Sequence, residues 1–169
     1  MATGTPDLGR RGFLTGRLAP ARDAVQPPWT RFEKLVAACT GCGACIDACP
    51  QAIVRMGPGR WPQIDFSRNE CTFCGKCAEA CPEPVFDRTL PAFPHVVAIG
   101  EACFAARGVV CQSCGDACPE GAIRFRPRLG GPALPELAAD RCTSCGACIS
   151  TCPADAIAVA VPIAEAVHV

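Results

Sequence analysis

Two segments of the chain place short apolar runs on either side of turn residues. After Pro50 the chain reads QAIVRMGPGRWPQIDFSRNEC, and after Pro119 it reads EGAIRFRPRLGGPALPELAADRC. In each segment an apolar run, at Ile53 or at Ile123, is followed by Gly and Pro residues and then by a return of the chain toward cysteines. Turn residues between short apolar runs are typical of β-hairpins. The pattern therefore predicts one hairpin in each segment.

The rest of the chain lacks comparable patterns. The link over 83–103 holds three prolines and no similar Gly turn, so we expect a connector there. In the second hairpin, alternation puts Arg124, Arg126 and Arg128 on one strand face, which is either solvated or a site for an acidic partner. No apolar run approaches the roughly 20 residues needed to span a membrane.

Residues 1–31 form a basic head with five arginines and two aspartates, whereas residues 32–169 carry 11 basic and 14 acidic groups. Its RRGFL stretch resembles a twin-arginine export signal, but no apolar segment follows, so we do not expect export. The head is either a flexible tail or a docking element with Phe13, Leu14 and Leu18 on a short helix. Trp29 either packs on the adjacent domain, which we favour, or anchors a partner.

The composition leaves little material for a conventional core. Only 6% of the 169 residues are aromatic, 33 are Gly or Pro, and 16 are Cys. Small domains with a poor core are usually held by disulfides or metal. The net charge is formally zero, which gives no case for nucleic acid or an anionic membrane as a partner.

The sixteen cysteines fall into four sets of four, numbered here in chain order. Sets one, two and four share the spacing C-x2-C-x2-C-x3-C-P, in CTGCGACIDACP, CTFCGKCAEACP and CTSCGACISTCP. Set three, in CFAARGVVCQSCGDACP, has seven residues between its first two cysteines. The sets are Cys39, Cys42, Cys45 and Cys49; Cys71, Cys74, Cys77 and Cys81; Cys103, Cys111, Cys114 and Cys118; and Cys142, Cys145, Cys148 and Cys152.

This spacing matches the ligand run of [4Fe–4S] ferredoxins. A tight loop can aim three thiolates at three iron corners of one cube, and the fourth cysteine, on a helical turn that faces away, reaches the neighbouring cluster. A disulfide framework has no reason to repeat the spacing, and zinc sites use paired C-x2-C units with longer spacers. Cys103 is the least regular candidate and is either a ligand or a spare thiol. We favour four [4Fe–4S] clusters, which use all sixteen cysteines.

The sets can pair in two ways. In the arrangement that we favour, the chain has an α+β fold with little regular secondary structure. It contains two two-cluster modules in tandem, over residues 32–90 and 91–162. The head precedes them, and a tail over 163–169 follows. In the alternative, sets two and three nest inside sets one and four. Tandem pairing predicts crossed ligand groups, namely Cys39, Cys42, Cys45 with Cys81; Cys71, Cys74, Cys77 with Cys49; Cys103, Cys111, Cys114 with Cys152; and Cys142, Cys145, Cys148 with Cys118.

We expect isoleucines to surround these clusters and the folding of the chain to be coupled to cluster binding. The isoleucines are Ile46, Ile53, Ile64, Ile123, Ile149 and Ile157. A protein that binds so many iron ions through thiolates needs a reducing compartment, so we expect it in the cytoplasm. His95 and His168 stand alone in the sequence and are expected to be structural or solvated.

Several stretches together resemble one family. They are RRGFL in the head, PPW before set one, CPEPVF after set two, and GVVCQSCGDACPEGAIRFRPRLGG around set three. These resemble the NapF-type ferredoxin-type proteins of the periplasmic nitrate reductase system. The resemblance implies a cytoplasmic protein with four [4Fe–4S] clusters that assists maturation of the catalytic subunit of nitrate reductase, at a stage that precedes export. The implied partner is the cytoplasmic precursor of that subunit.

Two functions stay open at this point. One is an assembly protein that donates a cluster or an electron to the reductase precursor, and the other is a general electron-transfer ferredoxin that serves a redox enzyme complex. We do not expect an enzyme, because the sequence has no nucleotide-binding loop, no Ser/His/Asp set and no flavin fingerprint. The neutral net charge and the basic head favour the assembly protein, since many free ferredoxins are strongly acidic.

Overall fold

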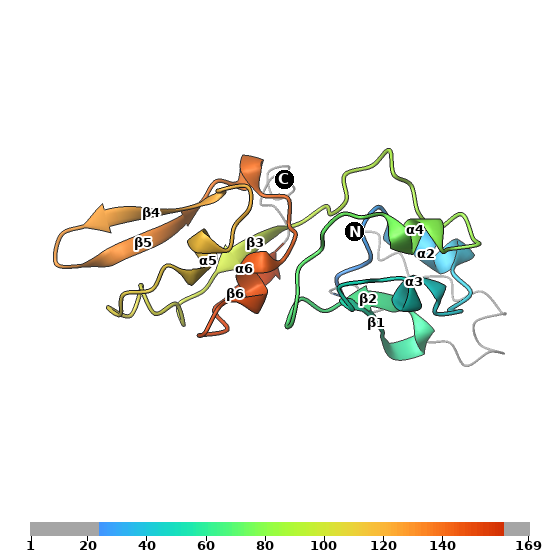
Figure 1. Cartoon of the computed structure of the whole chain (residues 1–169), viewed down its shortest axis with the longest axis horizontal. Coiled ribbons are helices and arrows are strands. Elements are labelled where there is room, and N and C mark those ends of the chain that lie inside the picture. The colour runs from blue at the N-terminus through green and yellow to red at the C-terminus, as the bar shows by residue number, and fades with distance from the viewer. Residues whose placement is uncertain (1–23, 161–169) are drawn as a thin grey trace, which may run out of the picture.

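The computed structural model describes residues 24–160 and places two small modules side by side along its long axis (Figure 1). Module 1 contains α2 (Phe32–Ala38), α3 (Ala44–Asp47), β1 (Val54–Met56), η1 (Pro58–Arg60), β2 (Pro62–Ile64) and α4 (Lys76–Glu79). Module 2 contains β3 (Val96–Ile99), α5 (Ser113–Asp116), β4 (Ile123–Arg128), β5 (Gly131–Leu137), η2 (Ala139–Arg141), α6 (Ala147–Ser150) and β6 (Ile157–Ala160). Short helices and two-stranded sheets alternate with loops, as expected from the sequence.

Both predicted hairpins are confirmed. Strands β1 and β2 pair antiparallel with Val54 opposite Ile64, and β4 and β5 pair antiparallel with Ile123 opposite Leu137. The second hairpin extends away from its module (Figure 1). Its arginine face is exposed, and the Arg126 Nε atom lies 2.6 Å from a carboxylate oxygen of Glu136 on the neighbouring strand. Both a solvated face and a site for an acidic partner require this exposure, so the two alternatives stay open.

The expectation of a plain connector over 83–103 is wrong in its last part. Residues 96–99 form β3, which pairs antiparallel with β6 and sets Val97 opposite Val159. Val96, Val97 and Ile99 are β-branched residues that suit a pleated, half-buried strand. The partner strand lies about 60 residues later in the chain, so no local turn marks the pairing.

Three of the short helices begin directly after a left-handed glycine. Gly43, Gly75 and Gly146 precede α3, α4 and α6 with φ values of 90°, 79° and 86°. Glycine adopts this conformation without the steric cost that a Cβ atom brings. Each sharp turn sends the third cysteine of its set inward at the start of the helix, and these cysteines (Cys45, Cys77 and Cys148) are buried.

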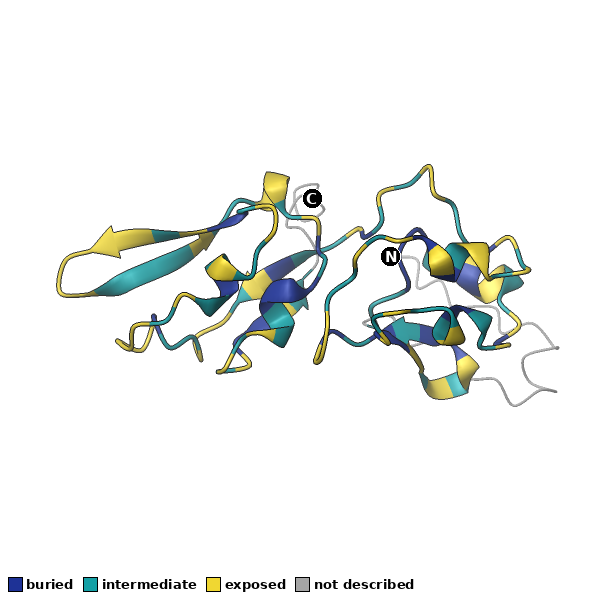
Figure 2. Cartoon of the chain, viewed as in Figure 1, coloured by how far each residue is buried: buried dark blue, intermediate teal, exposed yellow. Residues whose placement is uncertain are grey.

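Buried residues occur in short stretches in both modules (Figure 2), and the apolar core is divided among small clusters of side chains. In module 1, Leu35 packs with Trp61 and Val85. Trp29 is buried with Ile53 in a second cluster, so the favoured packing of Trp29 on its own module is confirmed. Residues 24–31 of the predicted head thus belong in part to the body of module 1. The predicted docking helix with Phe13, Leu14 and Leu18 lies outside the described residues.

Leu35 provides a test of this packing. Its side chain is 1% exposed, whereas its neighbour Val36 on the same helix is 43% exposed. Leu35→Ala should lower the free energy of unfolding by about 2–5 kcal/mol, because it removes buried methyl groups and leaves a cavity. Anaerobic urea unfolding of the iron-loaded protein measures the change. The control Val36→Ala should stay within about 0.5 kcal/mol of the parent, and equal losses in the two variants would contradict the described packing.

Candidate functional site

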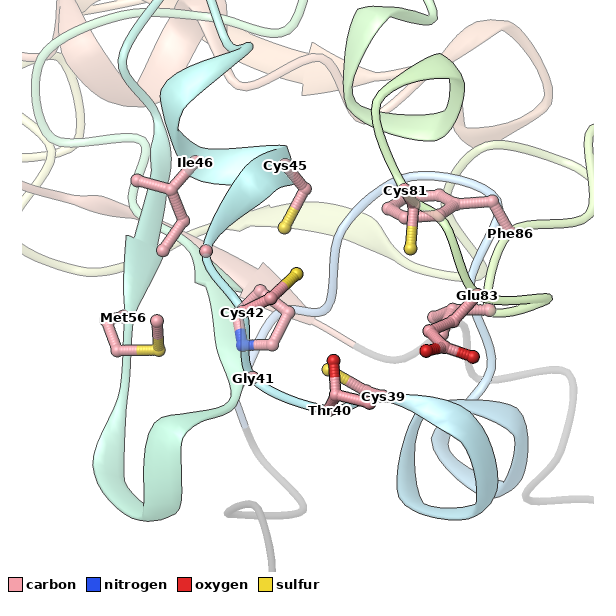
Figure 3. Close-up of a pocket in the computed structure, with 13 residues that line it drawn as sticks. Cys39, Thr40, Gly41, Cys42, Cys45, Ile46, Met56, Cys81, Glu83 and Phe86 are labelled. Atoms are coloured by element: carbon pink, nitrogen blue, oxygen red, sulfur yellow. The ribbon is translucent and has the colours of Figure 1, made fainter.

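A cavity in module 1 brings together cysteines from sets one and two. Its lining includes Cys39, Cys42, Cys45 and Cys81, and the free space among the side chains is about 380 Å³. Figure 3 shows the four sulfur atoms directed toward the same central space, with Met56 and Phe86 at its sides. The first three thiols come from one loop and the start of α3, and Cys81 arrives from the end of α4.

Two further cavities have the same construction. The second cavity lies in module 1, is lined by Cys49, Cys71, Cys74 and Cys77, and has about 340 Å³ of free space. The third lies in module 2, is lined by Cys103, Cys111, Cys114 and Cys152, and also has about 340 Å³. Each takes three cysteines from one set and the fourth from the paired set. Their similar size and lining indicate that they are built for the same group.

Crossed pairing leaves Cys118, Cys142, Cys145 and Cys148 for a fourth group. Burial, and then the neighbouring thiols Cys145, Cys142, Cys114 and Cys118, together raise the pKa of Cys148 to about 12. The cavities thus contain three of the four groups that tandem pairing with crossed ligands predicts, and the remaining cysteines are those of the fourth. The nested arrangement is not formed, because each of the three cavities combines cysteines of a single module.

Cys103 lies in the third cavity despite its unusual distance from Cys111. The intervening loop folds on itself, because the Arg107 amide donates to the Cys103 carbonyl at 3.1 Å and the Val109 amide donates to the Phe104 carbonyl at 2.8 Å. Ala105, inside the loop, has no exposed surface. The extra residues therefore form an ordered turn that returns the chain to the cavity.

Ionisation of the buried thiols is unfavourable unless a cation is bound. Burial, and then the neighbouring Cys39, Cys81 and Cys42, together raise the pKa of Cys45 to about 11. Burial and the charge of Cys71 likewise raise the pKa of Cys77 to about 12. At neutral pH these thiols keep their protons until a positively charged metal core displaces them. Binding of such a core therefore releases protons and stabilises the folded chain.

Backbone amides also point at cysteine sulfurs in module 2. The amides of Ala122 and Ala156 donate to the sulfur atoms of Cys118 and Cys152, each at 3.3 Å. Hydrogen bonds to ligand sulfur stabilise an anionic cluster and adjust its reduction potential. Apolar residues complete the cavity walls, and the expected isoleucines are among them, with Ile46 at the first cavity, Ile53 and Ile64 at the second, and Ile157 at the third.

The geometry fits a cubane in each group. All sixteen cysteines lie within residues 24–160 and all are free, so the disulfide framework is not formed. Among the described residues no three Cys, His, Asp or Glu side chains converge closely enough to bind a single metal ion. Four thiols spread around a shared space instead suit a cube with one iron at each bound corner. When bound, such a cluster would supply one-electron redox chemistry.

Sequence reasoning missed two side chains beside these sites. Phe73 and Ser144 occupy the same position, two residues after the first cysteine of their sets, and both have positive φ values, 53° and 59°. Set one has Gly41 at this position, with φ 70°. The comparison of CTGC with CTFC and CTSC could have singled out the two positions where a side chain replaces the glycine.

Cys103 gives the most informative test of the cavities. Cys103→Ser should remove the cluster from the third cavity and lower the iron and sulfide content by about one quarter, because one of four thiolates is lost. Iron and acid-labile sulfide analysis after anaerobic purification measures this. The control is Ser113→Ala, since Ser113 also lines the third cavity but is no thiol. Unchanged iron in Cys103→Ser would show that Cys103 is a spare thiol.

Comparisons with known proteins agree with this geometry. The model of the 4Fe-4S dicluster domain family matches residues 38–85 and 109–156, one match in each module, and Cys103 lies outside the second match. The ferredoxin-type protein NapF of Escherichia coli is 44% identical over 153 residues, which cover 89% of this chain and 93% of that protein. NapF of Haemophilus influenzae is 38% identical over 163 residues, with the same coverage.

A more distant relative shares part of the chain. It is one of the subunits of an ion-translocating oxidoreductase complex from Methanosarcina acetivorans, 36% identical over 126 residues, which cover 70% of this chain and 46% of that relative. In residues 24–160, no helix has both the length and the apolar character needed to cross a membrane.

One family assignment follows from these findings. It rests on the two dicluster matches, on the paired cysteine cavities and on the similarity to NapF proteins along most of the chain. The chain belongs to the NapF-type ferredoxin-type proteins and contains two 4Fe–4S dicluster domains in tandem.

Proposed function

We propose that this protein binds four [4Fe–4S] clusters through its sixteen cysteines and acts in the cytoplasm as a maturation protein for the catalytic subunit of periplasmic nitrate reductase. It would bind the precursor of that enzyme prior to export and donate a cluster or an electron to it. It would have no catalytic activity of its own. The relationship to NapF proteins supports the nitrate reductase system as its setting.

The observation that carries this proposal is the exposure of two equivalent cysteines. Cys42 and Cys74, the second cysteines of sets one and two, are exposed, whereas the other fourteen are half-buried or buried. Clusters held there would reach the surface of module 1. A surface ligand suits thiolate exchange with a partner as well as outer-sphere electron donation, since both need close approach.

A second candidate is a general electron-transfer ferredoxin. It is favoured by a contact between the modules, where the Cys71 amide donates a hydrogen bond to the Cys145 carbonyl at 2.7 Å. Cysteines of two different groups are thereby neighbours, as electron transfer through the whole chain requires. The two candidates differ in the partner, which is the reductase precursor in one case and a redox enzyme complex in the other.

Removal of the clusters should unfold the protein. The apolar clusters are small and include cysteines of the cavities, so the folded state depends on the bound metal. Treatment with an iron chelator and an oxidant should make the chain sensitive to limited proteolysis, and anaerobic reconstitution with iron and sulfide should restore resistance. A compact, protease-resistant iron-free form would contradict this dependence.

Labelled iron distinguishes cluster donation from electron donation to the precursor. The protein loaded with ⁵⁷Fe is mixed anaerobically with the cluster-free reductase precursor, the two are separated, and the label in the precursor is measured. Cluster donation predicts transfer of the label, and electron donation predicts reduction of a precursor that carries its own cluster without transfer. The control replaces the precursor with the mature, cluster-loaded enzyme. If the protein neither binds the precursor, nor transfers label, nor reduces it, the maturation proposal is wrong.

A further inference from the structure

The two modules meet at the loops of cysteine sets two and four. The Cys71 amide donates to the Cys145 carbonyl at 2.7 Å, which ties a residue of the second cavity to a residue of the fourth group. The second cavity and the fourth group are therefore in direct backbone contact.

Aromatic residues fill the space around this contact. The ring of Phe66, from module 1, covers Gly146 of module 2 so closely that a Cβ atom at Gly146 would clash with it. The Phe93 ring lies 5.8 Å from that of Phe66 and 6.1 Å from that of Phe73, in edge-to-face geometry. Ile149 of module 2 packs against the same cluster. The junction is therefore apolar and closely packed where these rings meet, and beside them a groove lined by residues of both modules, Asp65 and Asp155 among them, stays open.

Two cysteine loops carry a side chain in a strained backbone conformation at the junction. The left-handed position that is Gly41 in set one is occupied by Phe73 and Ser144 in sets two and four. Both side chains are used in the junction, because Phe73 packs on Phe93 and the Ser144 hydroxyl donates to the carbonyl of His95. Strain at non-glycine residues persists where the surrounding contacts compensate for it.

His95 adds to the uncharged character of the junction. Its ring centroid lies 5.0 Å from that of Phe93, and burial lowers its pKa, which favours the neutral imidazole. Its Nε2 atom is buried and has no hydrogen-bond partner among the described residues. The sequence predicted that His95 is structural or solvated, and the structural alternative is confirmed, because its carbonyl and its ring lie at the contact between the modules.

We propose that these contacts form an electron bridge between the modules. They hold the second cavity against the fourth group, so that electrons pass along the chain in the order first, second, fourth and third. This proposal rests on the proposed function in one respect, namely that the groups hold [4Fe–4S] clusters. At the bridge, one electron leaves a reduced cluster on one side, which is oxidised, and enters an oxidised cluster on the other, which is reduced. No bond or proton changes place.

EPR spectroscopy of the full-length, iron-loaded and fully reduced protein tests the bridge. Reduced clusters are paramagnetic, and neighbours broaden each other's lines. With a bridge, the wild-type line shape requires magnetic interaction between the modules in addition to that within each module. Without a bridge, the EPR line shape is reproduced by two independent pairs of clusters, and that result overturns the proposal. This measurement requires no variant to fold.

Two matched glycine substitutions test whether the magnetic interaction between the modules depends on the contact of Phe66 with Gly146. Gly146→Ala adds a methyl group that meets the Phe66 ring, whereas Gly43→Ala adds one at an equivalent left-handed helix start where the nearest atom, Met56 Cε, lies 3.8 Å away. Gly146→Ala should lose the interaction between modules while it keeps wild-type iron content, and Gly43→Ala should retain it. Adding Phe66→Ala to Gly146→Ala removes the clashing ring and should restore the interaction.

The outcomes separate the two proposals. Loss of the interaction in both glycine variants, or in neither variant at full iron content, contradicts the bridge. If Gly146→Ala fails to load iron, the EPR line shape of the wild-type protein alone decides whether the bridge exists. Failure of the proposed function is recognised differently, by iron and sulfide contents too low for four clusters or by absence of any effect on the reductase precursor.

Discussion

The convergence of thiols from two cysteine sets on one cavity is the constraint on which the rest of this structure depends. Three thiols come from one loop, and the fourth comes from a cysteine about 20 to 50 residues away, so every cavity joins two distant parts of its module. The hairpins β1–β2 and β4–β5 span the distance between the paired sets. The apolar clusters are small and are partly made of the same buried cysteines, so the sites and the core are one structure.

Backbone conformation serves the same constraint. Left-handed glycines let the chain turn sharply enough to direct three thiols inward from a short loop. At Phe73 and Ser144 the chain accepts the cost of a side chain in that conformation, and both side chains lie at the contact between modules. The junction is therefore specified by residues within the cysteine loops. Folding of the two modules and their attachment to each other depend on the same few segments.

Much of this arrangement could be predicted from local sequence. The repeated spacing identifies the four sets, and the turn residues after Pro50 and Pro119 predict the hairpins that pair them. The pairing of β3 with β6 was missed, because the two strands lie about 60 residues apart and no local turn connects them. The contact of Cys71 with Cys145 was missed for the same reason. The spacing of cysteines along the chain predicts which thiols can share a cluster. Contacts between the modules depend on how the two folded surfaces fit together, which the spacing does not predict.

The position of each iron cluster tests the central claim most directly. Diffraction data collected at the iron absorption edge from anaerobic crystals of the loaded protein would locate the iron atoms independently of any assumption about the ligands. The account predicts four compact iron sites, each bound by three cysteines of one set and one of the paired set, as with Cys81 beside Cys39, Cys42 and Cys45. Fewer sites, or a cluster bound by all four cysteines of a single set, would contradict it.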